Sequence, residues 1–126
     1  MQYMLLIYGS EAGMTSATEA DRNAMFKAYG EFTANIIKSD HMRAGDALQP
    51  SSTATTVRVR EGRTLTTDGP FAETKEQLGG YYLVEAKDLD EAIKVAARIP
   101  GAQVGSIEVR PVMVLPPDYP RPAVRK

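Results

Sequence analysis

The sequence predicts an α+β domain of the ferredoxin-like type, with the element order βαββαβ and one β-hairpin inserted between the second and third strands. Three observations predict this fold. Strand-like and helix-like segments alternate along the chain. The first strand is apolar on both faces, which is typical of the middle of a sheet. A start signal precedes each of two helices. We assign residues 1–115 to this domain and residues 116–126 to a proline-rich tail.

The first third of the chain supplies the central strand and the long helix. Residues 3–8 form the strand, and Gly9-Ser10 closes it. Ser16 and Glu19 fit a capping box with Ser16 as the N-cap, and we expect the helix to continue to about Ser39. On the strand, Tyr3, Leu5 and Ile7 share one face, and Met4, Leu6 and Tyr8 share the other.

The middle of the chain reads as strands joined by turns. Residues 44–48 form a short strand, and residues 51–55 a linker rich in Ser and Thr. Residues 56–60 alternate in polarity, Glu61-Gly62 is a two-residue turn signal, and residues 63–67 return as the partner strand.

The last third completes the sheet. Residues 81–85 form a strand, and Asp88 caps a helix whose predicted buried positions are Leu89, Ile93, Ala96 and Ala97. Pro100-Gly101 ends the helix. Residues 105–110 form the last strand, with Ile107 and Val109 facing the core; Val112 and Val114 are candidates to extend it. From Pro116 we expect a stiff, extended tail.

A sheet with two helices on one face leaves the other face bare. We expect that face to carry Met4, Leu6, Tyr82 and Val84, which are too many apolar side chains to leave in water. We therefore predict that two such sheets pack face to face as a homodimer.

Composition excludes several classes of protein and site. The chain has no cysteine and one histidine, which excludes thiolate chemistry and His-rich metal sites within one chain. No metal spacing and no Gly-rich phosphate loop is present, so we expect no cofactor. The net charge of −1 without a basic block argues against nucleic acid and membrane partners. We expect a soluble cytoplasmic protein whose C-terminal basic residues, Arg121, Arg125 and Lys126, belong to a solvated tail.

Residues 68–76, with the sequence DGPFAETKE, are the strongest candidate for chemistry. Gly69-Pro70 signals a turn between two strands, and such loops carry function more often than packing. Asp68 is a candidate general base, or a turn cap that bonds nearby backbone N–H groups. Glu73 and Lys75 are candidate walls of a pocket, or solvated surface charges; for Glu76 we favour the solvated reading.

Other candidates lie on the predicted strands. Arg110 is placed to clamp a substrate carboxylate, or to tie down the Asp68 loop or an acidic group across the dimer. Asp46 is an inward-facing charge if it shares a face with Ala44 and Leu48, or a residue of the solvent-exposed face. Tyr81 and Tyr82 point to opposite sides, so one belongs to the core and the other offers a hydroxyl to a cleft. His41, after the long helix, is read as an exposed residue or a helix-dipole partner. The candidate set is Asp68 and Glu73 as catalytic residues, and Lys75, Arg110, Tyr82, Phe71 and Asp46 for substrate binding.

The nine residues 68–76 resemble the signature of the DGPFAETKE family, a branch of the YCII-related proteins. The resemblance continues through residues 77–82, the helix start at residues 88–92 and residues 107–112, and so covers Met4 to Val112. It implies a dimeric α+β barrel, in which two ferredoxin-like sheets surround a cleft. That superfamily includes muconolactone isomerase-like and dehydrochlorinase-like enzymes and monooxygenases. Genes of this branch are often associated with extracytoplasmic-function sigma factors.

One departure affects the mechanism. YCII-type relatives resemble each other in a His–Asp pair whose histidine lies on the first helix, and residues 20–37 contain no histidine here. We therefore carry three hypotheses. The first is a cofactor-independent acid–base enzyme of isomerase or lyase type that acts on a small organic acid or aromatic compound. The second is a ligand-sensing or partner-binding module without turnover, with a link to a sigma factor. The third is a dimer whose loop only stabilises the fold.

Overall fold

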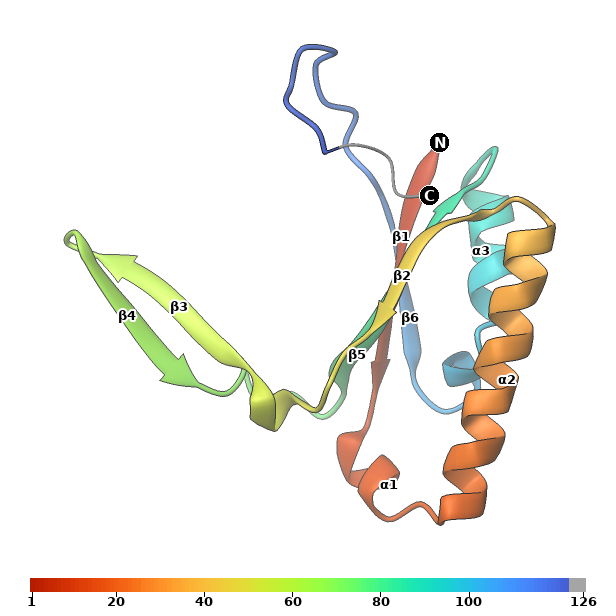
Figure 1. Cartoon of the computed structure of the whole chain (residues 1–126), viewed down its shortest axis with the longest axis horizontal. Coiled ribbons are helices and arrows are strands. Elements are labelled where there is room, and N and C mark those ends of the chain that lie inside the picture. Colours follow the sequence, from red (N-terminus) through yellow and green to blue (C-terminus); the bar gives the residue numbers. More distant parts are fainter. Residues whose placement is uncertain (123–126) are drawn as a thin grey trace.

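Helices and strands follow one another in the predicted order, with one additional short helix, α1 (Figure 1). The computed structural model describes residues 1–122 of the chain. The strands are β1 (Gln2–Gly9), β2 (Met42–Ala47), β3 (Thr55–Arg60), β4 (Arg63–Asp68), β5 (Gln77–Glu85) and β6 (Ser106–Pro111). The helices are α1 (Glu11–Thr15), α2 (Glu19–Lys38) and α3 (Leu89–Ala97), with two 3₁₀ turns, η1 (Ser51–Thr53) and η2 (Pro100–Gln103).

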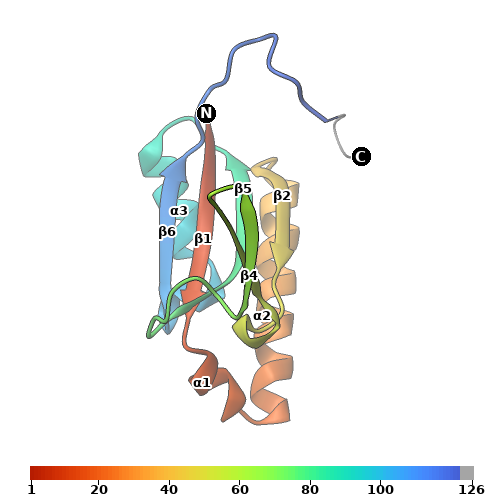
Figure 2. The ribbon, with the colours of Figure 1, turned by 90° about the vertical axis from the view of Figure 1, so that its left-hand side faces the viewer.

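Four antiparallel strands form the main sheet in the order β2-β5-β1-β6. Helices α2 and α3 lie together on one face of it, and the other face has no helix on it (Figures 1 and 2). Strands β3 and β4 form a separate two-stranded sheet. The predicted ferredoxin-like α+β fold with an inserted hairpin is thus confirmed. Strand β1 lies between β5 and β6, in the central position that its two apolar faces predict.

The core lies between the sheet and the helices. Tyr82 belongs to it: its ring packs edge-on against Phe32 of α2, with centroids 5.2 Å apart, and its hydroxyl is 2.7 Å from Thr33 Oγ1. The prediction that Tyr82 and Val84 lie on the bare face is therefore wrong. Alternation along β5 separates Tyr81 from Tyr82, but it does not say which of them faces the helices. The buried apolar residues are Tyr3, Leu5, Phe32, Ile36, Tyr82, Val84, Ala86, Ala92, Val95, Ala96 and Ile99.

Helix starts and faces differ from the prediction in two places. The N-cap of α2 is Thr18, whose Oγ1 accepts a hydrogen bond from the Asp21 N–H at 3.1 Å, whereas Ser16 ends α1. Asp88 caps α3 as predicted, with its Oδ1 2.9 Å from the Glu91 nitrogen. The buried stripe of α3 is Ala92, Val95 and Ala96, while Leu89, Ile93 and Ala97 are exposed.

The insert projects from the main sheet on the side of the bare face (Figure 1). We call β3 and β4 the arm. Its turn is the predicted Glu61-Gly62, with φ of 52° and 75°, as a two-residue hairpin requires. The chain leaves the main sheet at the end of β2 and returns at Gln77, where β5 begins to pair with β1. The Leu48 N–H donates to the Gly79 carbonyl at 2.9 Å.

The segment after β6 also projects on this side of the sheet (Figure 1). Val112 N donates to the Gln2 carbonyl at 2.9 Å, so pairing with β1 continues one step past β6 but does not reach Val114. The tail is not uniformly extended, because Tyr119 N donates to the Pro116 carbonyl at 3.0 Å and closes a turn. Arg125 and Lys126, assigned above to a solvated tail, lie outside the described residues.

Candidate functional site

The bare face of the main sheet, here called the open face, carries side chains in rows that follow the strand register. One row runs across β2, β5, β1 and β6 as Asp46, Tyr81, Leu6 and Glu108. The next row runs as Ala44, Leu83, Met4 and Arg110. The middle of the face is therefore apolar, and its polar groups stand near the two edges.

A tyrosine–carboxylate pair stands at the β2 edge. The Tyr81 hydroxyl donates to Asp46 Oδ2 at 2.7 Å. The two residues are direct partners in the β2–β5 ladder, which points both side chains to the same face. Gly80 lets the strands approach closely here, because a Cβ at this position would lie 2.9 Å from the Asp46 carbonyl oxygen. Asp46 is thus the acidic candidate that the structure places on the open face.

An ion pair stands at the opposite edge. The Arg110 guanidinium contacts the Glu108 carboxylate, two residues earlier on the same face of β6. The Arg110 side chain stays largely exposed, so its remaining N–H groups are accessible to an anion. Three strand spacings separate the two edges, a distance of about 14 Å.

The motif loop, residues 68–76, connects the arm to β5 rather than lining the open face. Gly69 anchors it: its N–H donates to the Ala54 carbonyl at 2.7 Å, and its own carbonyl accepts from Thr56 Oγ1 at 2.8 Å. The side chains of Asp68, Glu73 and Lys75 are exposed, and none has a hydrogen bond or ion pair within residues 1–122. The turn-cap role considered for the Asp68 carboxylate is therefore absent there.

Two further residues of the loop take opposite roles. Phe71 is 80% exposed, although it was a candidate for a cleft. Glu76 is bonded instead of solvated, because its Oε1 accepts from Ser106 Oγ at 2.8 Å. Glu76 therefore fixes the end of the loop to the start of β6.

Glu11 holds the base of the arm. Its carboxylate accepts hydrogen bonds from the Ser51 hydroxyl and from the Ser51 N–H at 2.7 Å, where η1 begins. Its own N–H donates to Gln77 Oε1 at 3.0 Å. The Ser51 hydroxyl, followed by the Ser51 N–H, lowers the pKa of Glu11 below its ordinary value of 4.5. Sequence reasoning missed this contact, because it joins a short unpredicted helix to a linker forty residues away.

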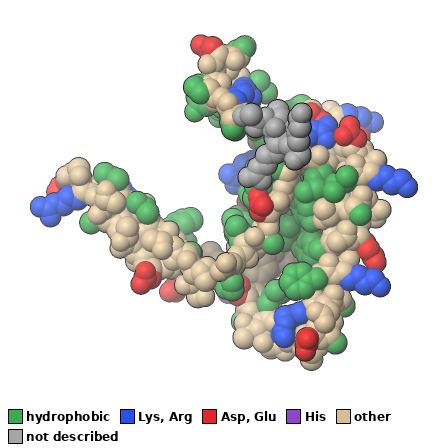
Figure 3. Space-filling view, viewed as in Figure 1, with side chains coloured by type: hydrophobic (Ala, Val, Ile, Leu, Met, Phe, Trp, Pro, Cys, Tyr) green, Lys and Arg blue, Asp and Glu red, His purple; other side chains and the backbone are tan. Residues whose placement is uncertain are grey.

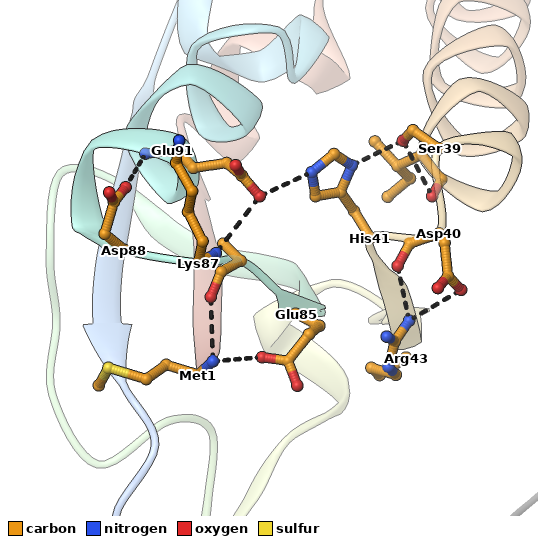
Figure 4. Close-up of polar contacts among 11 residues, drawn as sticks. Met1, Ser39, Asp40, His41, Arg43, Glu85, Lys87, Asp88 and Glu91 are labelled. Carbon is orange, nitrogen blue, oxygen red and sulfur yellow. Dashed lines mark hydrogen bonds and ion pairs between the residues drawn. The ribbon is translucent and has the colours of Figure 1, made fainter.

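A pocket of about 320 Å³ lies elsewhere and contains the single histidine (Figure 4). His41 Nδ1 is 2.6 Å from Ser39 Oγ at the end of α2, and its Nε2 is 3.1 Å from Glu91 Oε1 in the first turn of α3. His41 is therefore half-buried and bonded on both sides, so it is not the exposed residue considered from sequence. Its place just after the C-terminus of α2 is compatible with the other alternative, a helix-dipole partner. None of Asp46, Tyr81, Glu108 and Arg110 lines this pocket.

Four other charged groups of this pocket are paired with each other: the Met1 ammonium, Glu85, Arg43 and Asp40. The Met1 ammonium lies 2.5 Å from Glu85 Oε2 and donates to the Ala86 carbonyl, and it lowers the pKa of Glu85. Arg43 binds the carbonyl of Asp40 at 2.8 Å and its carboxylate at 3.4 Å. These contacts join α2, β2, β5 and α3 at one end of the domain, which is a structural role. The open face is the stronger candidate for ligand binding.

Residues 1–122 contain neither a metal-binding cluster nor a membrane-spanning helix. No group of three His, Asp or Glu side chains has the arrangement of a metal site. No helix in this part of the chain is long and apolar enough to cross a membrane.

Comparisons with known proteins agree with the fold. Residues 1–116 match the family model of the YCII-related domain. The chain is 33% identical over 119 residues to the uncharacterised protein R00369 of Rhizobium meliloti (strain 1021), an alignment that covers 93% of this chain and 96% of that protein.

Proposed function

The chain belongs to the YCII-related family, and from that premise we propose that it is a homodimer in which two open faces enclose a cleft for a small organic acid. The apolar middle of the open face supports the dimer. Met4, Leu6 and Leu83 lie side by side across β1 and β5, remain partly exposed, and have no helix over them. A second sheet packed on them removes this apolar surface from water.

The observation that carries the proposal is the hydrogen bond between Tyr81 and Asp46 on this face. Small-molecule sites are mostly apolar, with a few polar groups that fix orientation and carry out chemistry. Asp46 acts as a general base: its carboxylate takes a proton from the carbon beside the substrate's carbonyl group and later returns that proton to the product. When Asp46 becomes protonated, the single Tyr81 O–H turns from the carboxyl group to the substrate oxygen on which negative charge develops.

Arg110, exposed at the opposite edge about 14 Å away, attracts the anionic substrate into the cleft. A guanidinium forms paired hydrogen bonds with a carboxylate, so the acid group is captured there before the substrate reaches Asp46. Asp68, Glu73 and Lys75 take no part in this chemistry, since they lie in the loop at the base of the arm. An isomerase-like or lyase-like reaction fits these groups, because it needs only proton transfer on an oriented substrate.

A second candidate function is a binding module without turnover, either a ligand sensor or a partner of a sigma factor. Two observations favour it. The single histidine is bonded between α2 and α3, so the open face lacks the commonest acid–base residue. The motif loop presents Phe71 and unpaired charges outward, as a protein-binding loop does.

The test uses the tyrosine next in sequence as a matched control. Tyr81→Phe and Asp46→Asn remove the pair on the open face, whereas Tyr82→Phe removes a hydroxyl from the helix side of the same strand. Native mass spectrometry gives the oligomeric state and any retained ligand, and a panel of small organic acids is screened by thermal shift and then for product formation. We expect a dimer that binds an acid, with binding or turnover lost in the first two variants only. A monomer, or equal effects of the two tyrosine variants, contradicts the proposal. Saturable binding without product supports the second function.

A further inference from the structure

We propose that the arms of the two copies lie antiparallel in the dimer, so that the arginines at the tip of one arm dock on the acidic motif loop of its partner. The inference rests on the proposed homodimer and adds which segments of the two copies meet. We call Arg58, Arg60 and Arg63 the arm tip. We call Asp68 and Glu73 the arm root.

The first step is that residues 1–122 provide no cover for the arm. Strands β3 and β4 pair with each other and with no strand of the main sheet. Val57 and Val59 are each 60% exposed, and the arm stands away from the body of the domain (Figure 3). A two-stranded hairpin is at best marginally stable in water. An arm of this kind therefore gains most of its stability from a surface outside its own chain.

The second step is the charge at the tip. The register sets Arg60 directly opposite Arg63 and places Arg58 two residues along on the same face. None of the three has an ion pair within residues 1–122, and basic side chains gather at the far end of the arm in Figure 3. Like charges directly opposite each other destabilise a hairpin. The tip therefore favours an acidic surface that neutralises it.

The third step is the charge at the root. Asp68 ends β4, Glu73 follows in the motif loop, and neither is paired within the same residues. Lys75 offsets part of this charge. Five residues of strand separate Thr55, opposite Asp68, from Arg60 at the tip, which is about 17 Å. Since charges are screened over about 8 Å at physiological salt, the root cannot neutralise the tip of its own arm.

The symmetry of a dimer indicates which partner covers the arm. In a two-fold dimer the same surface is used by both copies, so that residue i of one contacts residue j of the other and the reverse contact also forms. Two antiparallel arms bring a basic tip to an acidic root twice. The arms also project on the side of the open face, where the second copy is proposed to lie (Figure 1). A second copy of this chain is therefore the partner whose charge pattern complements the arm at both ends.

The test exchanges the charges. In the tip-reversed variant Arg58, Arg60 and Arg63 are changed to Glu, and in the root-reversed variant Asp68 and Glu73 are changed to Lys. Each variant alone brings like charges together at both contacts, so we expect its dimer dissociation constant to rise at least about tenfold at low salt. A mixture of the two variants should form a heterodimer with near-original affinity, identified by its mass in native mass spectrometry. A chain that carries all five changes should again form a homodimer.

The control and the contrary outcomes separate this inference from the proposed function. Lys27→Glu together with Lys94→Glu changes two exposed charges on the helices and should leave the dissociation constant unchanged. Circular dichroism verifies that each variant is folded. If the reversed variants dimerise as tightly as the original chain, or if the mixture shows no preference for the heterodimer, the arm contact is wrong while the dimer stands. A monomeric original chain contradicts both proposals.

Discussion

Among single residues, Gly80 decides whether the tyrosine–carboxylate pair can form. A methyl group at Gly80 meets the Asp46 carbonyl at 2.9 Å, whereas one at the neighbouring Gly79 has nothing closer than 4.0 Å. We therefore expect Gly80→Ala to move β2 away from β5, lower the free energy of unfolding by about 1–3 kcal/mol and weaken ligand binding. Gly79→Ala should do neither. Urea unfolding measures the first effect, and thermal shift with an acid found in the proposed screen measures the second. Equal behaviour of the two variants would show that the close approach is unimportant.

The identity of the open-face tyrosine shows where sequence reasoning ends at this scale. Alternation correctly separates Tyr81 from Tyr82, but both side chains suit either a core or a cleft. Helix α2 decides between them, because Phe32 and Thr33 lie against Tyr82. The alternation along its strand made Asp46 a candidate site residue. Its hydrogen bond to Tyr81 depends on the register between β2 and β5, which cannot be read from either strand alone.

Between elements, the Glu11 carboxylate joins α1 to η1 and so fixes the base of the arm. Its pKa is lowered in the folded chain, so it stabilises the fold above pH 4.5, and this stabilisation is lost as the pH falls through the lower, folded-state value. We expect Glu11→Gln to lower the free energy of unfolding by about 1 kcal/mol at pH 7. The difference from the original chain should shrink as the pH is lowered below 4.5. A difference that stays constant from pH 7 to pH 3 would show that the charge of Glu11 is irrelevant.

The sequence patterns predicted that the two long helices exist. They were less accurate about the residue at which each helix begins and about which of its faces is buried. Ser16 and Thr18 both satisfy the residue preference for an N-cap, and α1 takes Ser16 as its own end. In α3 the positions 92, 95 and 96 face the sheet, because small Ala and Val side chains allow close packing there. Leu89 and Ile93 had been predicted to be buried because they are the larger apolar side chains of this helix. Tertiary packing overrode the local preference in both helices.

For the whole molecule, the decisive surface is the open face. Leu6 lies at its centre, in the row between Tyr81 and Glu108. If two open faces meet as proposed, Leu6→Glu should yield a monomer, because a carboxylate there must lose its hydration when the two sheets pack together. Ala34→Glu, on the exposed side of α2, should leave the dimer intact. Sedimentation velocity at micromolar concentration distinguishes the two, and a dimeric Leu6→Glu variant would place the interface elsewhere.

The sheet order was predictable because the alternation of elements allows few ways to join a split βαβ unit. The direction in which the arm projects was not predictable. The turn residues and the two flanking strand segments indicate only that a hairpin forms. The pocket around His41 was also missed, because Glu91 lies fifty residues along the chain from His41 and only the folded chain brings the two together.

The hydrogen bond between Leu48 and Gly79 has one more consequence. It joins the two ends of the segment that carries the arm, and β5 pairs with β1 from Gln77 onward. The arm itself, β3 and β4, can therefore lengthen, shorten or change its charges through mutation without altering the register of the main sheet. If the arms meet in the dimer as proposed, duplicated copies of this gene that diverge in the arm alone stop mixing their subunits, while the residues of the open face are inherited unchanged.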